Sequence, residues 1–266
     1  MTETWTKVWA RGFTREENLT VIEREVKSVR WRKIKAKILS QYGSFSGLNV
    51  IEVGSGRGIY GLLTAREGCR VTLLDNNEFA LEKAHELFSD WDQNFEGIQA
   101  DAFDLPTHLI GKFDIAMSYG LAEHFRYPER LQIFESHKKL LKPGGLLIAS
   151  IPNALFFPYR IGKFLLEAMD KWRLGLEIPF SRRELIHIGN KLGLKDHKVF
   201  GSGFAGDSLN FWLTQRLIHL APFLWDKFRT AKKVTPLKER SSYFSFDPES
   251  WLDDYLGYAL VLVGGI

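Results

Sequence analysis

An apolar run at residues 50–53 leads directly into three glycines at alternate positions, Gly54, Gly56 and Gly58. Glycine has no Cβ and tolerates positive φ, so such a loop can turn sharply and bring its backbone close to a ligand. The residues after Gly58 predict a helix, and the free N–H groups of its first turn point back at that ligand. A strand, a glycine loop and a helix in this order predict an open α/β sheet that binds its ligand where the strands end.

The spacing of the glycines separates two kinds of cofactor. A dinucleotide fingerprint, Gly-x-Gly-x-x-Gly, requires glycine at position 59, where this chain has Ile59. The pattern here, Glu-x-Gly-x-Gly-x-Gly, resembles motif I of the class I S-adenosylmethionine-dependent methyltransferases. The resemblance implies S-adenosylmethionine as cofactor and S-adenosylhomocysteine as product. It places the methionine part of the cofactor beside Glu52, Gly54, Ser55, Gly56 and Gly58.

Apolar strands alternate with helical segments from residue 47 onward. We expect strands at 48–53, 70–74, 97–99, 113–118 and 146–151, and helices at 59–67, 79–88 and 128–141. This alternation predicts a parallel sheet covered by helices on both faces. The family resemblance implies a three-layer, Rossmann-like α/β fold. Its seven strands would be mostly parallel, in the order 3-2-1-4-5-7-6, with the last strand antiparallel.

The chain on either side of this alternation predicts further helices and strands. Thr14 and Glu17 have the spacing of a capping box, and an apolar stripe follows, so we expect one long helix that ends near Gly43. A second capping box begins at Ser181 and predicts a helix to residue 192. Apolar runs predict strands near 199–200 and at 255–263.

We therefore predict two parts of the chain. Residues 1–46 form an N-terminal helical cap, and residues 47–266 form the methyltransferase domain. The resemblance is clear over residues 47–151 and weaker beyond them. Two aromatic segments, 154–180 and 202–250, are expected on the substrate side, the second as a helical insert before the last strand.

Acidic residues follow the next two strands. Asp75 ends the second strand, where a carboxylate can accept both hydroxyls of a ribose, and Asn76 could add a contact. The same residues also suit a turn and a helix cap. Asp101 and Ala102 resemble the Asp-Ala pair of the family, which implies that the acid and the next backbone N–H meet the adenine. A surface turn is the alternative interpretation for this pair.

Residues 113–125 carry the second strong match, to small-molecule methyltransferases of the ubiquinone-biosynthesis type. Asp114 is interpreted as structural. The resemblance implies that Ser118, Tyr119 and Gly120 border the methyl donor.

The Glu-His pair that follows could act on the acceptor. His124 has an ordinary pKa near neutrality and could remove a proton from a hydroxyl or amine; the alternative is a histidine that only fixes the loop. Glu123 could bind the ammonium of the cofactor or an amine of the substrate.

Charge is distributed unevenly along the 266 residues. The net charge is +4, but residues 1–40 and residues 208–240 each carry +5, which leaves the rest of the chain at −6. Basic appendages can attract phosphates or anionic lipid, and solvated helix faces are the simpler explanation. Residues 208–235 are aromatic and basic. They could cover an apolar acceptor, contact a membrane surface or pack on the core.

Composition limits the remaining classes. A single cysteine excludes an internal disulfide framework and a cysteine-based zinc site, and we expect no metal. The chain shows no secretory signal and no apolar run of roughly 18 residues, so we expect a cytoplasmic protein.

The function that we predict is S-adenosylmethionine-dependent methyl transfer, by in-line displacement, to a small, apolar or amphipathic acceptor. Three alternatives stay open. A nicotinamide oxidoreductase is opposed by Ile59. A non-catalytic adenosylmethionine-binding assembly protein would keep the cofactor pocket without an acceptor cleft. An RNA methyltransferase would use the basic appendages, but the chain lacks the Asn/Asp-Pro-Pro-Tyr/Phe motif and we expect no nucleic acid. The acceptor and the oligomeric state do not follow from the sequence.

Overall fold

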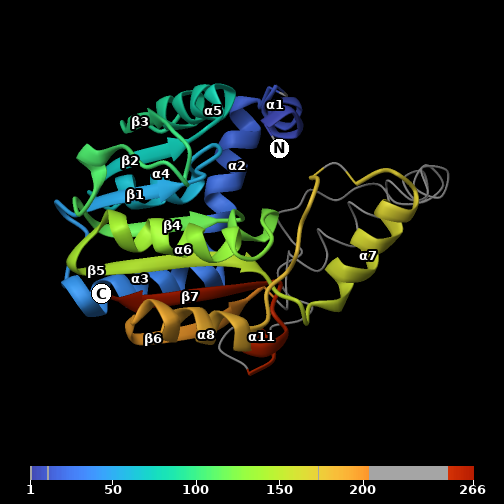
Figure 1. The fold of residues 1–266 in the computed structure, drawn as a ribbon. Coiled ribbons are helices and arrows are strands. Elements are labelled where there is room, and N and C mark those ends of the chain that lie inside the picture. The colour runs from blue at the N-terminus through green and yellow to red at the C-terminus, as the bar shows by residue number, and fades with distance from the viewer. Residues whose placement is uncertain (1, 11, 173, 204–250) are drawn as a thin grey trace.

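A computed structural model describes residues 2–10, 12–172, 174–203 and 251–266. In these ranges seven strands form one sheet of order β3-β2-β1-β4-β5-β7-β6 (Figure 1). The strands are β1 Asn49–Val53, β2 Arg70–Asp75, β3 Glu96–Gln99, β4 Phe113–Tyr119, β5 Leu141–Pro152, β6 Lys195–Ser202 and β7 Ala259–Gly265. The pairs among β1 to β5 are parallel, and β7 is antiparallel to both β5 and β6. The predicted fold class and strand order are confirmed.

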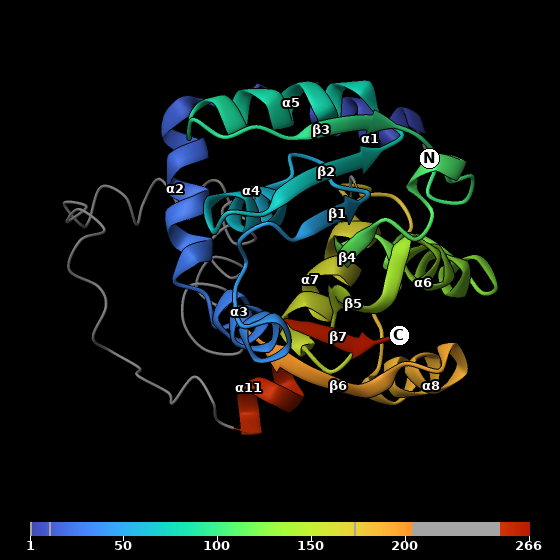
Figure 2. The ribbon, with the colours of Figure 1, turned by 90° about the vertical axis from the view of Figure 1, so that its left-hand side faces the viewer.

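Helices cover both faces of the sheet (Figure 2). The α-helices are α1 Thr2–Trp9, α2 Arg15–Val26, α3 Val29–Tyr42, α4 Ile59–Arg66, α5 Glu78–Ser89, α6 Glu129–Leu140, α7 Phe157–Ala168, α8 Arg182–Leu192 and α11 Trp251–Leu256. Two single-turn 3-10 helices, η1 Thr107–Leu109 and η2 Ala122–His124, lie in loops. Helices α3, α4 and α5 bury apolar side chains on one face, and α6 and α8 do so on the other.

Alternation along the strands builds the two core layers. In β1, Val50 packs with the α3–α4–α5 layer, whereas the next residue, Ile51, packs with the α6–α8 layer. Successive strand side chains point to opposite faces, so a strand buried on both sides must be apolar throughout. The carboxyl ends of β1, β2 and β4 are thereby brought to one edge of the sheet.

The N-terminal region departs from the single long helix that the sequence predicts. The capping box at Thr14 and the end at Gly43 are both present. However, the chain breaks at Ser28, whose extended backbone and side chain, which accepts the N–H of Trp31 at 3.0 Å, start a separate helix. The stripe of apolar residues continues through both helices, and therefore periodicity alone missed the break.

Several predicted boundaries also change. Strand β5 begins at Leu141 rather than 146, because Leu141 already pairs with Phe113 of β4 ahead of the Lys-Pro-Gly-Gly turn. Residues Trp251–Leu256 form α11, so the last strand begins at Ala259 rather than 255. The insert predicted within 202–250 lies almost entirely outside the described residues, as does the segment 208–235. The division of the chain into a helical cap at residues 1–46 and a methyltransferase domain at residues 47–266 stays a prediction.

Asp114 joins three parts of the fold, as its structural interpretation requires. Its carboxylate accepts the backbone N–H of Asn49 at 2.8 Å and pairs with Nζ of Lys142 at 2.8 Å. These contacts connect the start of β1 to the strands β4 and β5. They lie at the opposite end of the strands from the glycine loop.

We predict that Asp114→Ala lowers the free energy of unfolding by about 1–3 kcal/mol, because it leaves a backbone donor and an ammonium without their acceptor. Chemical denaturation of the purified variant measures this change. Asp104→Ala, at an exposed position, serves as the control and should change stability by less than about 0.5 kcal/mol. Equal stability of the two variants would contradict the structural role.

Candidate functional site

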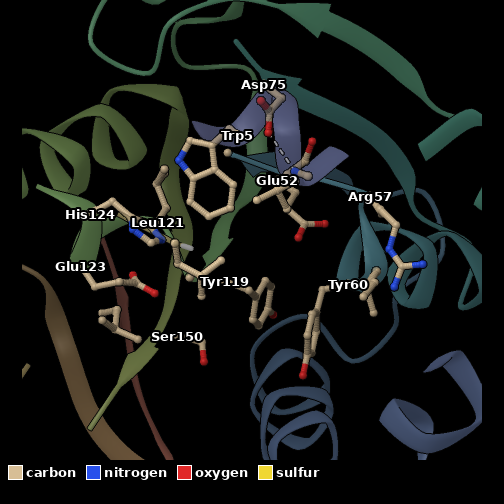
Figure 3. A pocket seen from close by; sticks show the side chains of 18 of the residues that line it. Trp5, Glu52, Arg57, Tyr60, Asp75, Tyr119, Leu121, Glu123, His124 and Ser150 are labelled. Carbon is tan, nitrogen blue, oxygen red and sulfur yellow. Dashed lines mark hydrogen bonds between the residues drawn. The ribbon is translucent and has the colours of Figure 1, made fainter. Parts of the chain in front are cut away.

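A cavity of about 570 Å³ lies where β1, β2, β4 and β5 end (Figure 3). This volume is in the range of sites for small molecules and cofactors. Its walls come from the glycine loop, the ends of β2 and β4, η2, the helices α1 to α4, and segments near residues 174–177 and 258. Most residues that the sequence singled out therefore lie around one space.

The glycine loop adopts the conformation that its sequence predicts. The φ angles of Gly54, Gly56 and Gly58 are +60°, +52° and +68°. Residues that have a Cβ rarely adopt these values. A Cβ on Gly54 would lie 2.6 Å from Cδ1 of Leu121. Gly54, Ser55 and Gly56 line the cavity, whereas Gly58 caps the start of α4.

Asp75 holds this loop in place. One carboxylate oxygen accepts the N–H of Gly56 at 2.8 Å, and the other accepts the N–H of Asn77 at 3.0 Å. Burial raises the pKa of Asp75, and the backbone donors oppose that rise. Each carboxylate oxygen keeps a further lone pair that can accept from a ligand in the cavity.

Glu52 is a second buried carboxyl at the cavity wall. It is 3% exposed, and its Oε2 accepts the N–H of Gly61 at 2.6 Å. Burial raises its pKa to about 8, the N–H of Gly61 opposes the rise, and the nearby charge of Asp75 adds to it. In the free protein at neutral pH, Glu52 is therefore mostly protonated.

The other predicted cofactor residues lie at different depths. Asn76, Asp101 and Ala102 line the cavity beyond β2 and β3, and Tyr119 and Gly120 line it at the end of β4. Ser118 is buried within β4 and is not among the lining residues.

Glu123 and His124 lie together on η2 and both face the cavity (Figure 3). Nδ1 of His124 is 2.8 Å from the carbonyl oxygen of Leu176; because a carbonyl only accepts, Nδ1 carries the proton in the neutral ring. Burial lowers the pKa of His124, and hydrogen bonds with the backbone of Leu176 and Gly120 oppose that change. Neutral His124 thus has its proton on Nδ1 and a lone pair on Nε2.

Residues that the sequence did not assign to the site complete the cavity. The rings of Trp5 and Trp9 on α1 are 6.3 Å apart, and Trp5 makes an edge contact with His124 at 4.8 Å. A Cβ on Gly56 would lie 2.7 Å from the ring of Trp9. In the sequence, both tryptophans belong to a short aromatic segment before the capping box at Thr14, which also contains Phe13.

A polar cluster forms another wall. Arg30 on α3 donates to Tyr60, to Ser150 at 3.3 Å and to Glu25 at 3.3 Å, and Tyr60 donates to Glu25 at 2.7 Å. Tyr60 also stacks on Tyr119 with ring centroids 3.5 Å apart. The cluster places a guanidinium on the same cavity as Glu52 and the glycine loop.

The described ranges contain neither a cluster of metal ligands nor a helix suited to a bilayer. No group of three or more His, Cys, Asp or Glu side chains in these ranges is arranged to hold a metal ion. Among the helices of the same ranges, none combines the length and the apolar character that crossing a bilayer requires.

Comparisons with known proteins agree with this geometry. A family model described as a methyltransferase domain matches residues 50–145. Ubiquinone biosynthesis O-methyltransferase of Actinobacillus pleuropneumoniae is 27% identical over 175 residues, 63% of this chain and 74% of the relative. The protein of the same name from Histophilus somni is 27% identical over 186 residues, 67% and 77% of the two chains.

Solved structures share the fold. Magnesium protoporphyrin IX methyltransferase from Synechocystis, with bound S-adenosylhomocysteine, has a TM-score of 0.55 at 17% identity, covering 76% of this chain and 88% of that one. A methyltransferase from Archaeoglobus fulgidus has a TM-score of 0.52 at 14% identity, covering 88% and 94%. Fold, family model and curated relatives all support a class I S-adenosylmethionine-dependent methyltransferase.

The raised pKa of Glu52 predicts a pH dependence of stability. In the unfolded chain this carboxyl loses its proton near its ordinary pKa of 4.5, whereas in the folded protein it keeps the proton until about 8. Unfolding between these values releases a proton, so the stability contributed by this group falls as pH rises from 4.5 to 8 and is level above that. Glu52→Gln should therefore lose less stability than the wild type over this interval.

Denaturant titrations of cofactor-free protein at pH 5, 6.5 and 8 measure the effect. Gln keeps an oxygen for the N–H of Gly61, which isolates the titration from the hydrogen bond. Glu82→Gln, on the exposed side of α5, should follow the wild type. The prediction is wrong if Glu52→Gln also shows the same dependence of stability on pH as the wild type.

Proposed function

We propose that this cavity binds S-adenosylmethionine and that the chain transfers its methyl group to a small, apolar or amphipathic acceptor. The observation that carries the proposal is one cavity bordered by the positive-φ glycines Gly54 and Gly56 and by acids at the ends of three consecutive strands. In this proposal Asp75 and Asn76 hold the ribose, and Asp101 and Ala102 meet the adenine.

The residues at the cavity fit an amino-acid tail. The glycine loop leaves its backbone accessible, Glu52 offers a carboxyl for an ammonium, and Arg30 offers a guanidinium for a carboxylate. Arg30 is oriented by Glu25 and Tyr60 before any ligand arrives. A guanidinium held in this way loses little conformational freedom on binding.

When bound, the cofactor supplies an electrophilic methyl group on a positively charged sulfur. The protein then needs chiefly to align the acceptor for in-line displacement and to exclude water, which can lower a barrier substantially. Trp5, Trp9 and Tyr119 provide aromatic walls on this cavity, and in this proposal they help to exclude water from the reacting groups. His124, neutral at pH 7, can accept a proton from the acceptor as the new bond forms.

The alternatives receive no comparable support. Ile59 lines the cavity where a dinucleotide site would need a glycine. The cytoplasmic location stays a prediction, and the membrane contact predicted for 208–235 falls outside the described residues.

Calorimetric titration with S-adenosylhomocysteine and with NADH tests the cofactor. We predict that the wild type binds the former and not the latter. Asp75→Asn should weaken S-adenosylhomocysteine binding at least about tenfold, because one of its oxygens becomes an amide donor that faces the backbone N–H groups of the loop. Asp104→Asn is the control. Binding of NADH instead would refute the proposal.

The role of His124 is tested by pH–rate profiles. For the wild type, kcat/KM should rise with pH through a midpoint below 6.5, where His124 loses its proton, and stay level above it. His124→Ala should lack this limb, turn over roughly 100-fold more slowly at neutral pH, and recover in part at high pH. His108→Ala, at an exposed position, should keep the wild-type profile. An unchanged rate for His124→Ala would leave this residue with a structural role only.

A further inference from the structure

The first helix, α1, borders the part of the cavity beside the glycine loop. It packs against α5 (Figure 1), and its residues Trp5, Val8 and Trp9 line the cavity. Residues at i, i+3 and i+4 lie on one face of a helix. Helix α1 therefore presents one apolar face, made mostly of indole rings, to the space that we propose holds the cofactor.

The protein itself covers this face only in part. Trp5, Val8 and Trp9 are each partly exposed, whereas Ile22 on α2 and Ile34 on α3 are almost fully buried. A helix of eight residues is too short to be stable alone in water, so it depends on the packing of its apolar face. A molecule that fills the cavity would cover more of this face, and covering apolar surface is favourable.

Trp9 is the residue of α1 that meets the glycine loop. A Cβ on Gly56 would lie 2.7 Å from the ring of Trp9, so the indole rests on the backbone of the loop. The N–H of the same glycine donates to Asp75 at 2.8 Å. A ligand that approaches this backbone must therefore also meet Trp9. An indole ring offers such a ligand a large contact area.

Helix α1 is also bonded to the segment that follows β2. Nδ2 of Asn77 donates to Oγ1 of Thr6 at 3.0 Å, and the backbone N–H of Asn77 donates to Asp75 at 3.0 Å. On its other side, Trp5 makes its edge contact with His124 (Figure 3). One short helix thus contacts the glycine loop, the loop after β2 and η2.

We propose that α1 is a cofactor-binding element, in which Trp9 packs on S-adenosylmethionine at the glycine loop and the bound cofactor completes the packing of the helix. This inference rests on the proposed function. It adds a residue that lies outside the range matched by the family model, residues 50–145. Because cofactor binding and helix docking share the same contacts, each stabilises the other. The docked helix then slows the release of the cofactor.

Binding and release of S-adenosylhomocysteine test the contact. Trp9→Ala should raise its Kd at least about tenfold, mostly through faster dissociation, as calorimetry and stopped-flow displacement measure. Trp9→Phe keeps an aromatic ring and should retain most of the affinity. Thr6→Val, which removes the acceptor for Asn77, should raise the Kd about threefold to tenfold. Trp251→Ala is the matched control, since this ring on α11 is 67% exposed and does not line the cavity.

Hydrogen exchange measures the docking of the helix without turnover. The N–H of Ala10 donates to the carbonyl of Thr6 at 2.8 Å, so this part of α1 is protected only while the helix is formed. In the wild type, saturation with S-adenosylhomocysteine should slow exchange in residues 2–10 at least about tenfold. Saturated Trp9→Ala should lack this gain. A peptide from α8, whose residues do not line the cavity, should exchange equally with and without the ligand.

The outcomes separate this inference from the proposed function. If S-adenosylhomocysteine does not bind the wild type, the proposed function fails. If it binds, but Trp9→Ala keeps the wild-type Kd or exchange in residues 2–10 does not respond to the ligand, the inference alone is wrong. Circular dichroism shows whether Trp9→Ala is folded. An unfolded variant would assign the ring to the stability of the fold, which also contradicts the inference.

Discussion

The parallel pairing of β1 with β2 and with β4 determines the geometry of the site. Val53 lies opposite Leu74, and Glu52 lies opposite Met117. The glycine loop and Asp75 therefore leave the sheet at the same height, and the carboxylate can accept the N–H of Gly56 at 2.8 Å. Because this contact follows from backbone register, a ligand meets a loop that is already ordered. The remaining walls are then added by segments that pack on this edge.

Buried carboxyls differ in how well the protein satisfies them. Both carboxylate oxygens of Asp75 accept a backbone N–H, whereas only one oxygen of Glu52 does. Oε2 of Glu123 has no hydrogen-bond partner among the described residues. Burying a carboxylate costs free energy unless donors replace water. The least satisfied groups are therefore where a bound molecule gains most. That order distinguishes Asp75, which orients the loop, from Glu52 and Glu123, whose oxygens can still accept hydrogen bonds from a ligand.

Local chemistry explains which features the sequence predicted. Three alternate glycines predict positive φ, and the loop has it, since no neighbour is needed to permit that conformation. The helix at Thr14 was predicted because its capping box is local. The break at Ser28 was missed because its cap has Trp31 in place of the acid of a capping box. Glu177 was missed because its segment reaches the cavity only after folding, when Ile178 bonds to the distant Glu123.

Part of the cavity wall lies outside the residues that the family model matches. The matched residues, 50–145, contain the glycine loop, the acids at the strand ends and the Glu-His pair. Trp5, Arg30, Glu177 and Tyr258 line the same cavity from outside that range. A helical cap that only stabilised the sheet would bury its aromatic rings in the core, as Trp31 does at 3% exposure. Trp5 and Trp9 instead lie against His124 and Gly56. The N-terminal region therefore borders the cavity, and we expect selectivity for the acceptor to depend on these walls, which lie outside the residues that the family model matches.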